Sequence, residues 1–446
     1  MAENPTIVAI ATPSGAGGIG IVRLSGSRST EIAKRLCGKS LRPRHAHFIS
    51  VVDAESRVID QGIGLYFKAP HSFTGEDVVE IQGHGSPVAL QMIVNRCLEL
   101  GARLARPGEF SERAFCNDKL DLSQAEAIAD LIESSTESAA RAAMRSLMGE
   151  FSEKVEALIE RLLQLRVFVE ASIDFPEEEI DFLAENDVLG RTRKVLEEFH
   201  RMRSMVRRGT LLRDAIRIVL VGPPNAGKSS LLNALCRENR AIVSDIPGTT
   251  RDLLEHAIQL NGYPVVLTDT AGLRENADLI EQEGIKRARQ ALAMADLALV
   301  CIDDACTDAA HVDKIITEEV PEGLGYCVVL NKADLAGKPA SRSGNRVSLS
   351  AKSGEGIDLL CDWISDIVGY SDHGQGQILA RQRHLDALKR AEACLQRGYR
   401  VFEESGAGEL LAEDLFLAAE ALGEITGKMS ADDLLGEIFG SFCIGK

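Results

Sequence analysis

A chain of 446 residues with a hydrophobic share of 45% and a charged share of 26% has the composition of a soluble globular protein, and it is too long for one ordinary core. The formal net charge of -17 argues against a general nucleic-acid coat, because such binding depends on neutralising phosphates, although one local basic face remains possible in such a chain. The ten cysteines form no C-x-x-C pair, the first residues are polar, and no apolar run approaches the roughly eighteen residues of a membrane span. Reduced thiols and a cytoplasmic location are therefore expected.

Four segments follow one another along the chain, and three different sequence textures distinguish them. Residues 1–118 alternate short β-like runs such as TIVAIAT and VVEIQGHG with Gly and Pro, interrupted by a helix-like segment at 87–100, and predict an α/β domain. Residues 119–214 carry apolar residues at helical spacing. Residues 215–369 alternate strands with helices, which predicts a parallel sheet with crossover helices, and helical texture returns over 370–446. The expected fold class is therefore α/β and α, multidomain, with one discontinuous helical domain into which an α/β domain is inserted.

The helical segment carries the densest arginine cluster of the chain, Arg201, Arg203, Arg207, Arg208 and Arg213. A solvated helix face is the first interpretation of such a run, and an RNA contact is the alternative.

The strongest chemical signal lies at the start of the inserted domain. The run RIVLVGPPNAGKSSLLNAL places Gly222-x-x-x-x-Gly227-Lys228-Ser229 between an apolar strand and an amphipathic helix. Such a loop points backbone N–H groups at an anion and cradles phosphates at the helix N-terminus. Lys228 is expected to reach the β- and γ-phosphates of a nucleotide, and the Ser229 hydroxyl to ligate Mg²⁺.

Three further elements follow in the order of a Ras-like P-loop GTPase domain with a mostly parallel sheet. Asp269 ends the apolar run VVLT and is expected near the metal. In the N-K-A-D run, Asp334 can accept from guanine N1–H and from the 2-amino group, and Ser350-Ala351-Lys352 would close over the base with a backbone N–H. Together these elements predict a guanine-nucleotide site.

Two loops between these elements bear on hydrolysis. SDIPGTTRD, residues 244–252, offers Thr249 and Thr250 as a switch that closes on the γ-phosphate and magnesium. In DTAGLRE, Leu273 takes the place at which Ras-like enzymes carry a water-orienting Gln, and it can neither donate nor accept a hydrogen bond.

The runs PNAGKSSLLNAL, DIPGTTRD, DTAGLR and NKAD, together with RPGEFSERAF, NDKLDLSQAEAIADLI and the terminal Cys-Ile-Gly-Lys, resemble the tRNA modification GTPase MnmE family, also called TrmE. The GTPase motifs alone would fit the wider Era/Der class, whereas LDLSQAEAIADLI and the C-I-G-K ending are specific to this family. The resemblance spans nearly the whole chain.

The resemblance implies a function and partners. Members of the family form homodimers, and each homodimer assembles with the flavoprotein MnmG (GidA) into a heterotetramer. No membrane partner is expected. The pair installs an aminomethyl or carboxymethylaminomethyl group on carbon 5 of the wobble uridine of certain tRNA substrates. The one-carbon unit comes from 5-formyl- or methylene-tetrahydrofolate, and glycine or ammonium supplies the amine.

The resemblance also implies site residues. The N-terminal domain binds the folate and dimerises, and Arg23, Glu80, Lys119 and Lys446 match the folate contacts; from the residues alone each would be an ordinary surface charge. Cys443, in the C-terminal motif, matches a catalytic position, although a buried structural thiol is equally consistent with the sequence.

A potassium ion is implied where another GTPase receives an arginine finger. Its ligands match Asn225, Ser244, Ile246 and Thr249, while Ser229 and Thr250 match the magnesium ligands. Water orientation then falls to Glu281, which from the residues alone is one of several acids in its segment. The catalytic set comprises Glu281, Asn225, Lys228 and Cys443.

The GTP-contacting positions fall into five matching segments. They are Asn225, Ala226, Gly227, Lys228, Ser229 and Ser230; Ser244, Asp245, Ile246, Pro247, Gly248, Thr249 and Thr250; Asp269, Thr270, Ala271 and Gly272; Asn331, Lys332, Ala333 and Asp334; and Ser350, Ala351 and Lys352.

Two alternatives remain from the sequence. A ribosome-assembly GTPase of the Era/Der class would share the central motifs, but a KH-type GXXG clamp does not follow the GTPase segment. A folate-dependent transferase whose GTPase domain serves only for binding is the second.

Overall fold

A computed structural model describes residues 4–174, 185–238, 240–241, 255–269, 290–304, 309–368, 377–428, 432–440, 442 and 445. The chain divides into two compact units. The first comprises residues 1–129, 152–160 and 419–446, and the second comprises residues 130–151 and 161–418.

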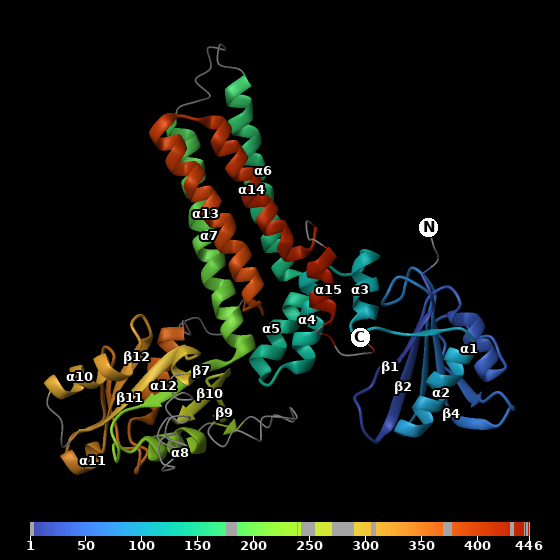
Figure 1. The fold of residues 1–446 in the computed structure, drawn as a ribbon, viewed down its shortest axis with the longest axis horizontal. Coiled ribbons are helices and arrows are strands. Elements are labelled where there is room, and N and C mark those ends of the chain that lie inside the picture. The colour runs from blue at the N-terminus through green and yellow to red at the C-terminus, as the bar shows by residue number, and fades with distance from the viewer. Residues whose placement is uncertain are drawn as a thin grey trace. The chain divides into compact units, whose positions relative to one another are not determined.

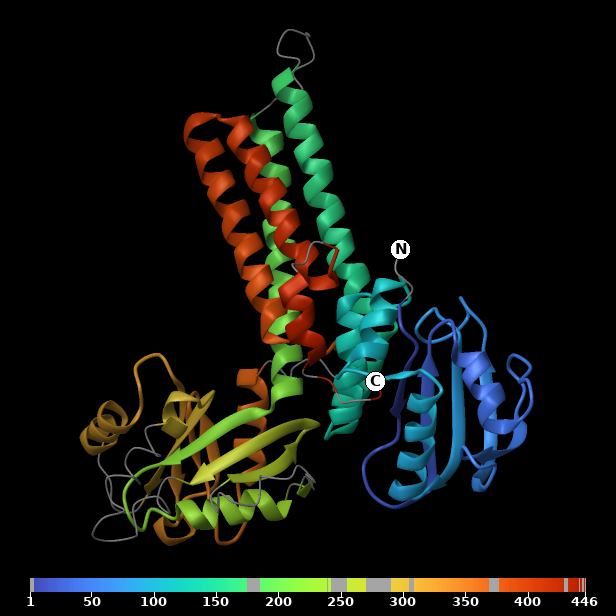
Figure 2. The ribbon, with the colours of Figure 1, turned by 45° about the vertical axis from the view of Figure 1, so that its right-hand side comes forward.

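The first unit contains a six-stranded sheet in the order β3-β4-β5-β2-β1-β6, in which β1 and β6 are parallel and the other neighbours antiparallel. Its strands are β1 (Ile7–Ile10), β2 (Gly17–Ser25), β3 (His47–Val52), β4 (Val58–Phe67), β5 (Val78–Gly85) and β6 (Arg103–Leu104). The helices α1 (Ser29–Cys37) and α2 (Pro87–Glu99) pack on one face of this sheet (Figure 2). The predicted helix-like segment at 87–100 is thus α2.

Local sequence explains why α2 begins where it does. The Ser86 hydroxyl accepts a hydrogen bond from the Ala89 N–H, and Pro87 occupies the first turn, where its missing N–H costs nothing. The buried side chains Leu90, Ile93 and Val94 recur at helical spacing and face the sheet.

The opposite face of β1 packs on α3 (Glu109–Cys116). Ile7 and Ala9 alternate with Val8 along β1 and join Phe110 in a second apolar cluster. A third cluster joins α4 (Leu122–Glu133) to α15 (Asp432–Gly440), near the C-terminal end of the chain, through Leu122 and Phe439. The first unit therefore combines the N-terminal sheet with C-terminal residues.

The second unit contains an eight-stranded sheet in the order β13-β14-β12-β11-β7-β10-β9-β8 (Figure 1). The five strands β14, β12, β11, β7 and β10 are parallel to their neighbours, and β9, β8 and β13 add antiparallel edges. The strands are β7 (Ile216–Val221), β8 (Arg240–Ala241), β9 (Glu255–Leu260), β10 (Tyr263–Asp269), β11 (Leu297–Asp303), β12 (Gly325–Asn331), β13 (Ser341–Ser343) and β14 (Arg346–Ser348). The predicted mostly parallel sheet is confirmed.

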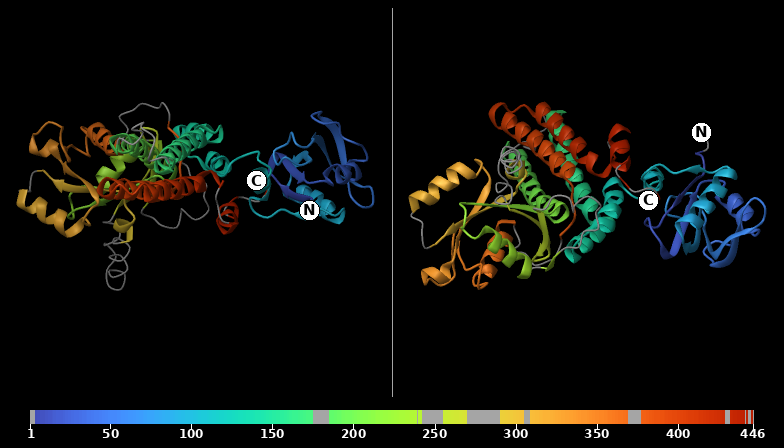
Figure 3. Two further views of the ribbon diagram at one scale, coloured as in Figure 1. Left: turned by 90° about the horizontal axis from the view of Figure 1, so that it is seen from above. Right: turned by 60° about the horizontal axis from the view of Figure 1, so that its bottom comes forward.

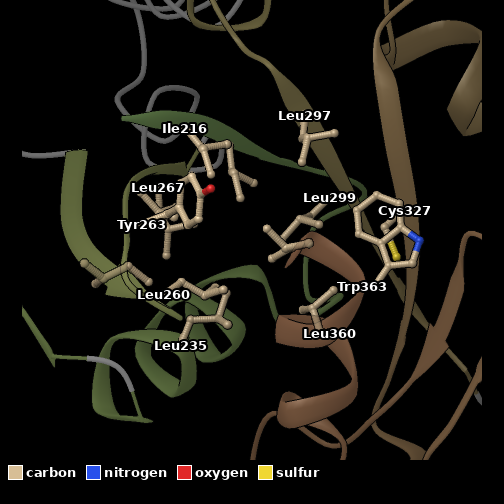
Figure 4. Close-up of a cluster of buried hydrophobic side chains, with 14 of the residues drawn as sticks. Ile216, Leu235, Leu260, Tyr263, Leu267, Leu297, Leu299, Cys327, Leu360 and Trp363 are labelled. Carbon is tan, nitrogen blue, oxygen red and sulfur yellow. The ribbon is translucent and has the colours of Figure 1, made fainter. Parts of the chain in front are cut away.

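Both faces of this sheet are covered, as a parallel sheet requires. Ile218 and Leu220 of β7 join the cluster built with α8 (Lys228–Glu238) and α12 (Ile357–Val368), in which Trp363 lies beside Cys327 (Figure 4). Val219 points to the other face and packs with α10 (Ala309–Glu319). A short helix, α11 (Ala333–Ala336), follows β12.

Long helices flank the inserted sheet in sequence. They are α5 (Glu137–Leu147), α6 (Glu150–Asp174), α7 (Glu185–Asp214), α13 (Gln382–Ser405) and α14 (Gly408–Thr426). The chain enters the sheet directly after α7 and leaves it before α13, and these two helices run side by side (Figures 1 and 3). In the described part of the chain every helix is too short or too polar to span a bilayer.

One buried carboxylate contacts both connections between the helices and the inserted sheet, the end of α7 and the segment before α13. Asp130 accepts hydrogen bonds from Arg213, at the end of α7, and from Arg381, just before α13, at 2.8 and 2.7 Å. The hydroxyl of Ser146 adds contacts to the backbone N–H and C=O of Leu379, both at 3.2 Å. Buried and part-buried polar bonds within the second unit therefore join the helices to the segments that enter and leave the inserted sheet.

Three arginines of the α7 cluster form ion pairs. Arg213 pairs with Asp130, Arg203 with Glu392 at 2.6 Å, and Arg201 with Glu197 at 3.7 Å. These ion pairs fit the interpretation as a helix face for three of the five arginines, while Arg207 is exposed and an RNA contact stays a prediction.

Candidate nucleotide site

The loop between β7 and α8 has a shape that only glycine allows at two positions. Gly222 has φ +131°, and a Cβ there would lie 2.1 Å from the Cys301 carbonyl oxygen. Gly227 has φ +92°, and its Cβ would lie 2.2 Å from Asn331 Nδ2. Any side chain at either position would displace backbone or a buried amide, so the spacing of the two glycines follows from the loop geometry.

Asn225 lies between these glycines in the left-handed region, with φ +61°. Asparagine adopts this conformation more readily than most residues do, because its short polar side chain can hydrogen-bond locally. The backbone alone therefore gives one reason for an Asn at this position, apart from any ligand role.

Lys228 and Ser229 open α8 and carry the polar groups of the loop. Lys228 is buried, and its ammonium donates to the carbonyl oxygens of Gly222 and Pro223 at 2.7 and 2.9 Å. The Ser229 hydroxyl donates to Asp269 Oδ2 at 3.0 Å. A hydroxyl and a carboxylate within hydrogen-bond distance of each other, beside backbone N–H groups at a helix N-terminus, suit a magnesium-bound phosphate.

The buried amide of Asn331 joins three segments of the site. Its Nδ2 donates to the Ala226 carbonyl at 2.9 Å, and its Oδ1 accepts from the Lys332 and Ala351 N–H groups at 2.8 and 3.0 Å. One side chain thus holds the phosphate loop, the N-K-A-D run and the 350–352 loop together.

These segments enclose a hollow of about 600 Å³. Asp334, in the first turn of α11, lines it, and so do Gly227, Ser230 and Ser350. Lys332 adopts φ +66°, and its ammonium pairs with Asp303 at 2.7 Å. The hollow thus places a carboxylate and the N-terminus of α8 around one space large enough for a nucleotide.

Two groups outside the recognised motifs also contact the phosphate loop. Cys301 is fully buried, its Sγ–H donates to the Ala226 carbonyl at 3.3 Å, and burial raises the pKa of this thiol to about 12, so it stays a donor. Glu319 Oε2 accepts from the Gly222 N–H at 2.9 Å. No motif spacing marks either residue, and the sequence offered no signal for them.

In the first unit, the structure brings two of the four implied folate contacts together. Arg23 and Glu80 are opposite each other on β2 and β5 and form an ion pair at 2.8 Å. The Arg23 guanidinium lies 5.5 Å from the Phe73 ring centre and 5.7 Å from that of Phe110, within cation–π distance. Lys119 is exposed, and its side chain lies next to Gly75.

The remaining implied residues lie outside the described part of the chain. They are Ser244, Asp245, Ile246, Pro247, Gly248, Thr249, Thr250, Thr270, Ala271, Gly272, Leu273, Glu281, Cys443 and Lys446. Gly445, beside Lys446, is described: a Cβ there would lie 2.2 Å from the Ile10 carbonyl oxygen, so this residue lies against the end of β1.

Comparisons with known proteins agree with this organisation. The family model of the TrmE N-terminus, described as a GTP-binding protein, matches residues 6–119, and that of the MnmE helical domain matches residues 122–443. The chain is 52% identical over 453 residues to a tRNA modification GTPase MnmE of Pseudomonas aeruginosa (strain UCBPP-PA14), with 100% of each chain covered. It is 52% identical over 448 residues to that of Hydrogenovibrio crunogenus, with 99% of each covered.

Among solved structures, Era of Aquifex aeolicus is 25% identical over 40% of this chain and 65% of its own, with a TM-score of 0.26. The full-length matches, in contrast, decide against the Era/Der alternative. The chain belongs to the tRNA modification GTPase MnmE family.

Proposed function

We propose that this protein is a potassium-activated GTPase that acts with the flavoprotein MnmG on the wobble uridine of certain tRNAs, using a one-carbon unit from tetrahydrofolate. The observation that carries the nucleotide part is the single network in which Asn331 joins the phosphate loop to both segments expected around guanine. Relatives named tRNA modification GTPases support the substrate.

In the proposed nucleotide complex, the residues around the hollow bind different parts of the nucleotide. The N–H groups of residues 225–230 and the Lys228 ammonium bind the phosphates, and Lys228 exchanges carbonyl partners for phosphate oxygens. Ser229 would hold Mg²⁺ together with Thr250, with Asp269 close by, and the ion would supply positive charge to the phosphates. Asp334 accepts two hydrogen bonds from guanine, and the 350–352 loop covers the base.

Potassium activation is proposed for the same loop. The Asn225 side chain supplies a carbonyl oxygen, a suitable ligand for a hard cation. Its ligand partners from residues 244–249, and Glu281 as the water-orienting group, lie outside the described residues. A well-placed positive charge, such as an arginine finger, contributes about 10³ to 10⁵ in rate in related phosphoryl transfers. In this proposal potassium takes the place of that finger, and Glu281 takes the place of the glutamine that Leu273 replaces.

The folate part of the proposal rests on the geometry around Arg23. Because Glu80 already neutralises Arg23, the pair presents a donor and an acceptor side by side, which suits the mixed hydrogen-bonding edge of a pterin. The partly exposed Phe73 ring offers apolar surface beside the pair, and the fully buried Phe110 ring supports the Arg23 guanidinium from the interior. Lys119 and Lys446 then serve the carboxylates of the glutamate tail, and Gly445 against β1 is consistent with a chain end in this region.

The test is a complementation experiment. A strain lacking this protein should accumulate tRNA with unmodified wobble uridine, and the wild-type chain, together with MnmG, should restore the modified nucleoside measured by mass spectrometry. A Glu80→Gln variant should lose folate binding and modification while keeping GTP hydrolysis. Normal wobble nucleosides in the deletion strain would contradict the proposed substrate.

A further inference from the structure

One carboxylate from the far end of a helix contacts the first residue of the phosphate loop. Glu319 is the last residue of α10, 97 positions from Gly222, and its Oε2 accepts the Gly222 N–H at 2.9 Å. The contact is part-buried and joins the outer helix layer to the loop itself.

The sheet explains why this N–H meets a side chain. The parallel ladder between β7 and β11 runs as far as Val221, which is paired with Val300. At Gly222 the chain turns with φ +131° and passes against the Cys301 carbonyl oxygen. A part-buried backbone donor that leaves a ladder needs another acceptor, because an unpaired one would cost free energy.

Gly222 is held on its other side as well. Its carbonyl oxygen accepts from the Lys228 ammonium at 2.7 Å. The two peptide groups that flank Gly222 are thus each bonded to a charged side chain, one to a carboxylate and one to an ammonium. Charge-assisted hydrogen bonds are stronger than neutral ones, and they are placed at the residue type with the greatest backbone freedom.

We propose that Glu319 is a positioning residue for the nucleotide phosphates. By fixing the peptide before Gly222, it sets the direction in which the loop leaves β7, and with it the placement of Lys228 and the loop N–H groups. Its carboxylate contacts the backbone and stabilises the binding-competent loop in advance, which lowers the cost of ordering on binding. The inference rests on the phosphate-binding role proposed above for residues 222–229.

The experiment measures GDP affinity of the full chain by fluorescence titration. Glu319→Ala removes the acceptor and should weaken binding about tenfold, the typical loss of one charge-assisted hydrogen bond. Glu319→Asp keeps the charge but shortens the reach and should resemble Glu319→Ala. Glu319→Gln keeps an oxygen at the same distance and should bind within about threefold of wild type, since a neutral acceptor retains part of the bond.

The matched control is Glu318→Ala, which removes an exposed acid one position earlier that pairs only weakly, at 3.8 Å, with Lys314. This variant should bind GDP as wild type does. The ³¹P resonance of the β-phosphate of bound GDP gives a readout of loop geometry: it should move in Glu319→Ala and Glu319→Asp and return in Glu319→Gln.

Wild-type affinity and an unmoved ³¹P resonance in Glu319→Ala would overturn the inference, and so would a Glu319→Gln variant as weak as Glu319→Ala. Should Glu319→Ala unfold, the Asp and Gln variants decide between the same outcomes. A wild-type chain that fails to bind GDP would contradict the phosphate role itself, which distinguishes failure of the proposed function from failure of this inference.

Discussion

Replacing Asn331 by alanine should weaken GDP binding by about 100-fold. The substitution removes one donor from the Ala226 carbonyl and takes the acceptor from the N–H groups of Lys332 and Ala351. Leaving a buried N–H unpaired costs about 1–3 kcal/mol. The Ala351 N–H is buried and the Lys332 N–H is part-buried, so together they give roughly 3 kcal/mol, which corresponds to about 100-fold in affinity. Because both N–H groups belong to loops that line the hollow, we expect this cost to appear in nucleotide binding.

The assay is a fluorescence titration with labelled GDP, accompanied by thermal unfolding to separate loss of affinity from loss of fold. Asn345→Ala is the matched control, because it removes the same amide group from an exposed turn of the same sheet. If Asn331→Ala bound GDP within about threefold of the wild-type affinity, the hydrogen bonds of Asn331 would not contribute as argued. If Asn345→Ala weakened GDP binding equally, the loss would not be specific to the nucleotide site.

Three further predictions concern pH, base specificity and the C-terminal motif. Burial alone would raise the pKa of Glu109, but hydrogen bonds from Arg103, the Arg106 N–H and Arg113 outweigh it and lower the pKa from 4.5 to about 2. Because the folded pKa is depressed, this stabilisation is present above pH 4.5 and lost as pH falls toward 2, so the free energy of unfolding in urea should drop by at most about 3 kcal/mol over that range. Glu109→Gln should flatten the decline, and an unchanged acid limb would contradict the assignment. Asp334→Asn should shift preference from GTP to xanthosine triphosphate in competition binding; retained GTP affinity with no gain for xanthosine triphosphate would show that Asp334 does not contact the base. Cys443→Ser should leave GTP hydrolysis near wild type and impair wobble-uridine modification, whereas equal loss of both activities would indicate a role in folding.

The sequence predicted the inserted sheet well because each of its signals is local. The strand before Gly222 and the helix after it are encoded in adjacent residues, and the carboxyl ends of parallel strands meet at one edge of a sheet. Ser229 and Asp269 were therefore expected near one metal, and their 3.0 Å contact agrees with that expectation.

Contacts between distant segments could not be predicted in the same way. The sequence positions of Glu319 and Cys301 do not predict a bond to the phosphate loop. The packing of α10 determines the Glu319 contact, and the register of β11 determines the Cys301 contact. The Arg23–Glu80 pair likewise depends on the register of β2 with β5, which alternation alone leaves open. The backbone conformation of Asn225 adds a reason for that residue which its motif did not reveal.

That conformation also decides how the potassium role is best tested. Asn225→Ala would remove the side-chain oxygen and at the same time strain a backbone at φ +61°. Asn225→Gly removes the same oxygen but tolerates the left-handed conformation, so it isolates the ligand role. Asn225→Asp serves as the control, because it keeps an oxygen in place.

The most direct test of the central claim is the rate of GTP hydrolysis by the full chain in potassium compared with sodium. We predict fast turnover in potassium and slow turnover in sodium for the wild type. Asn225→Gly should lose the potassium response while still binding GDP through Lys228 and the loop N–H groups, and Asn225→Asp should keep the response in part. Hydrolysis by the wild type that is indifferent to the cation, or an intact potassium response in Asn225→Gly, would contradict the account.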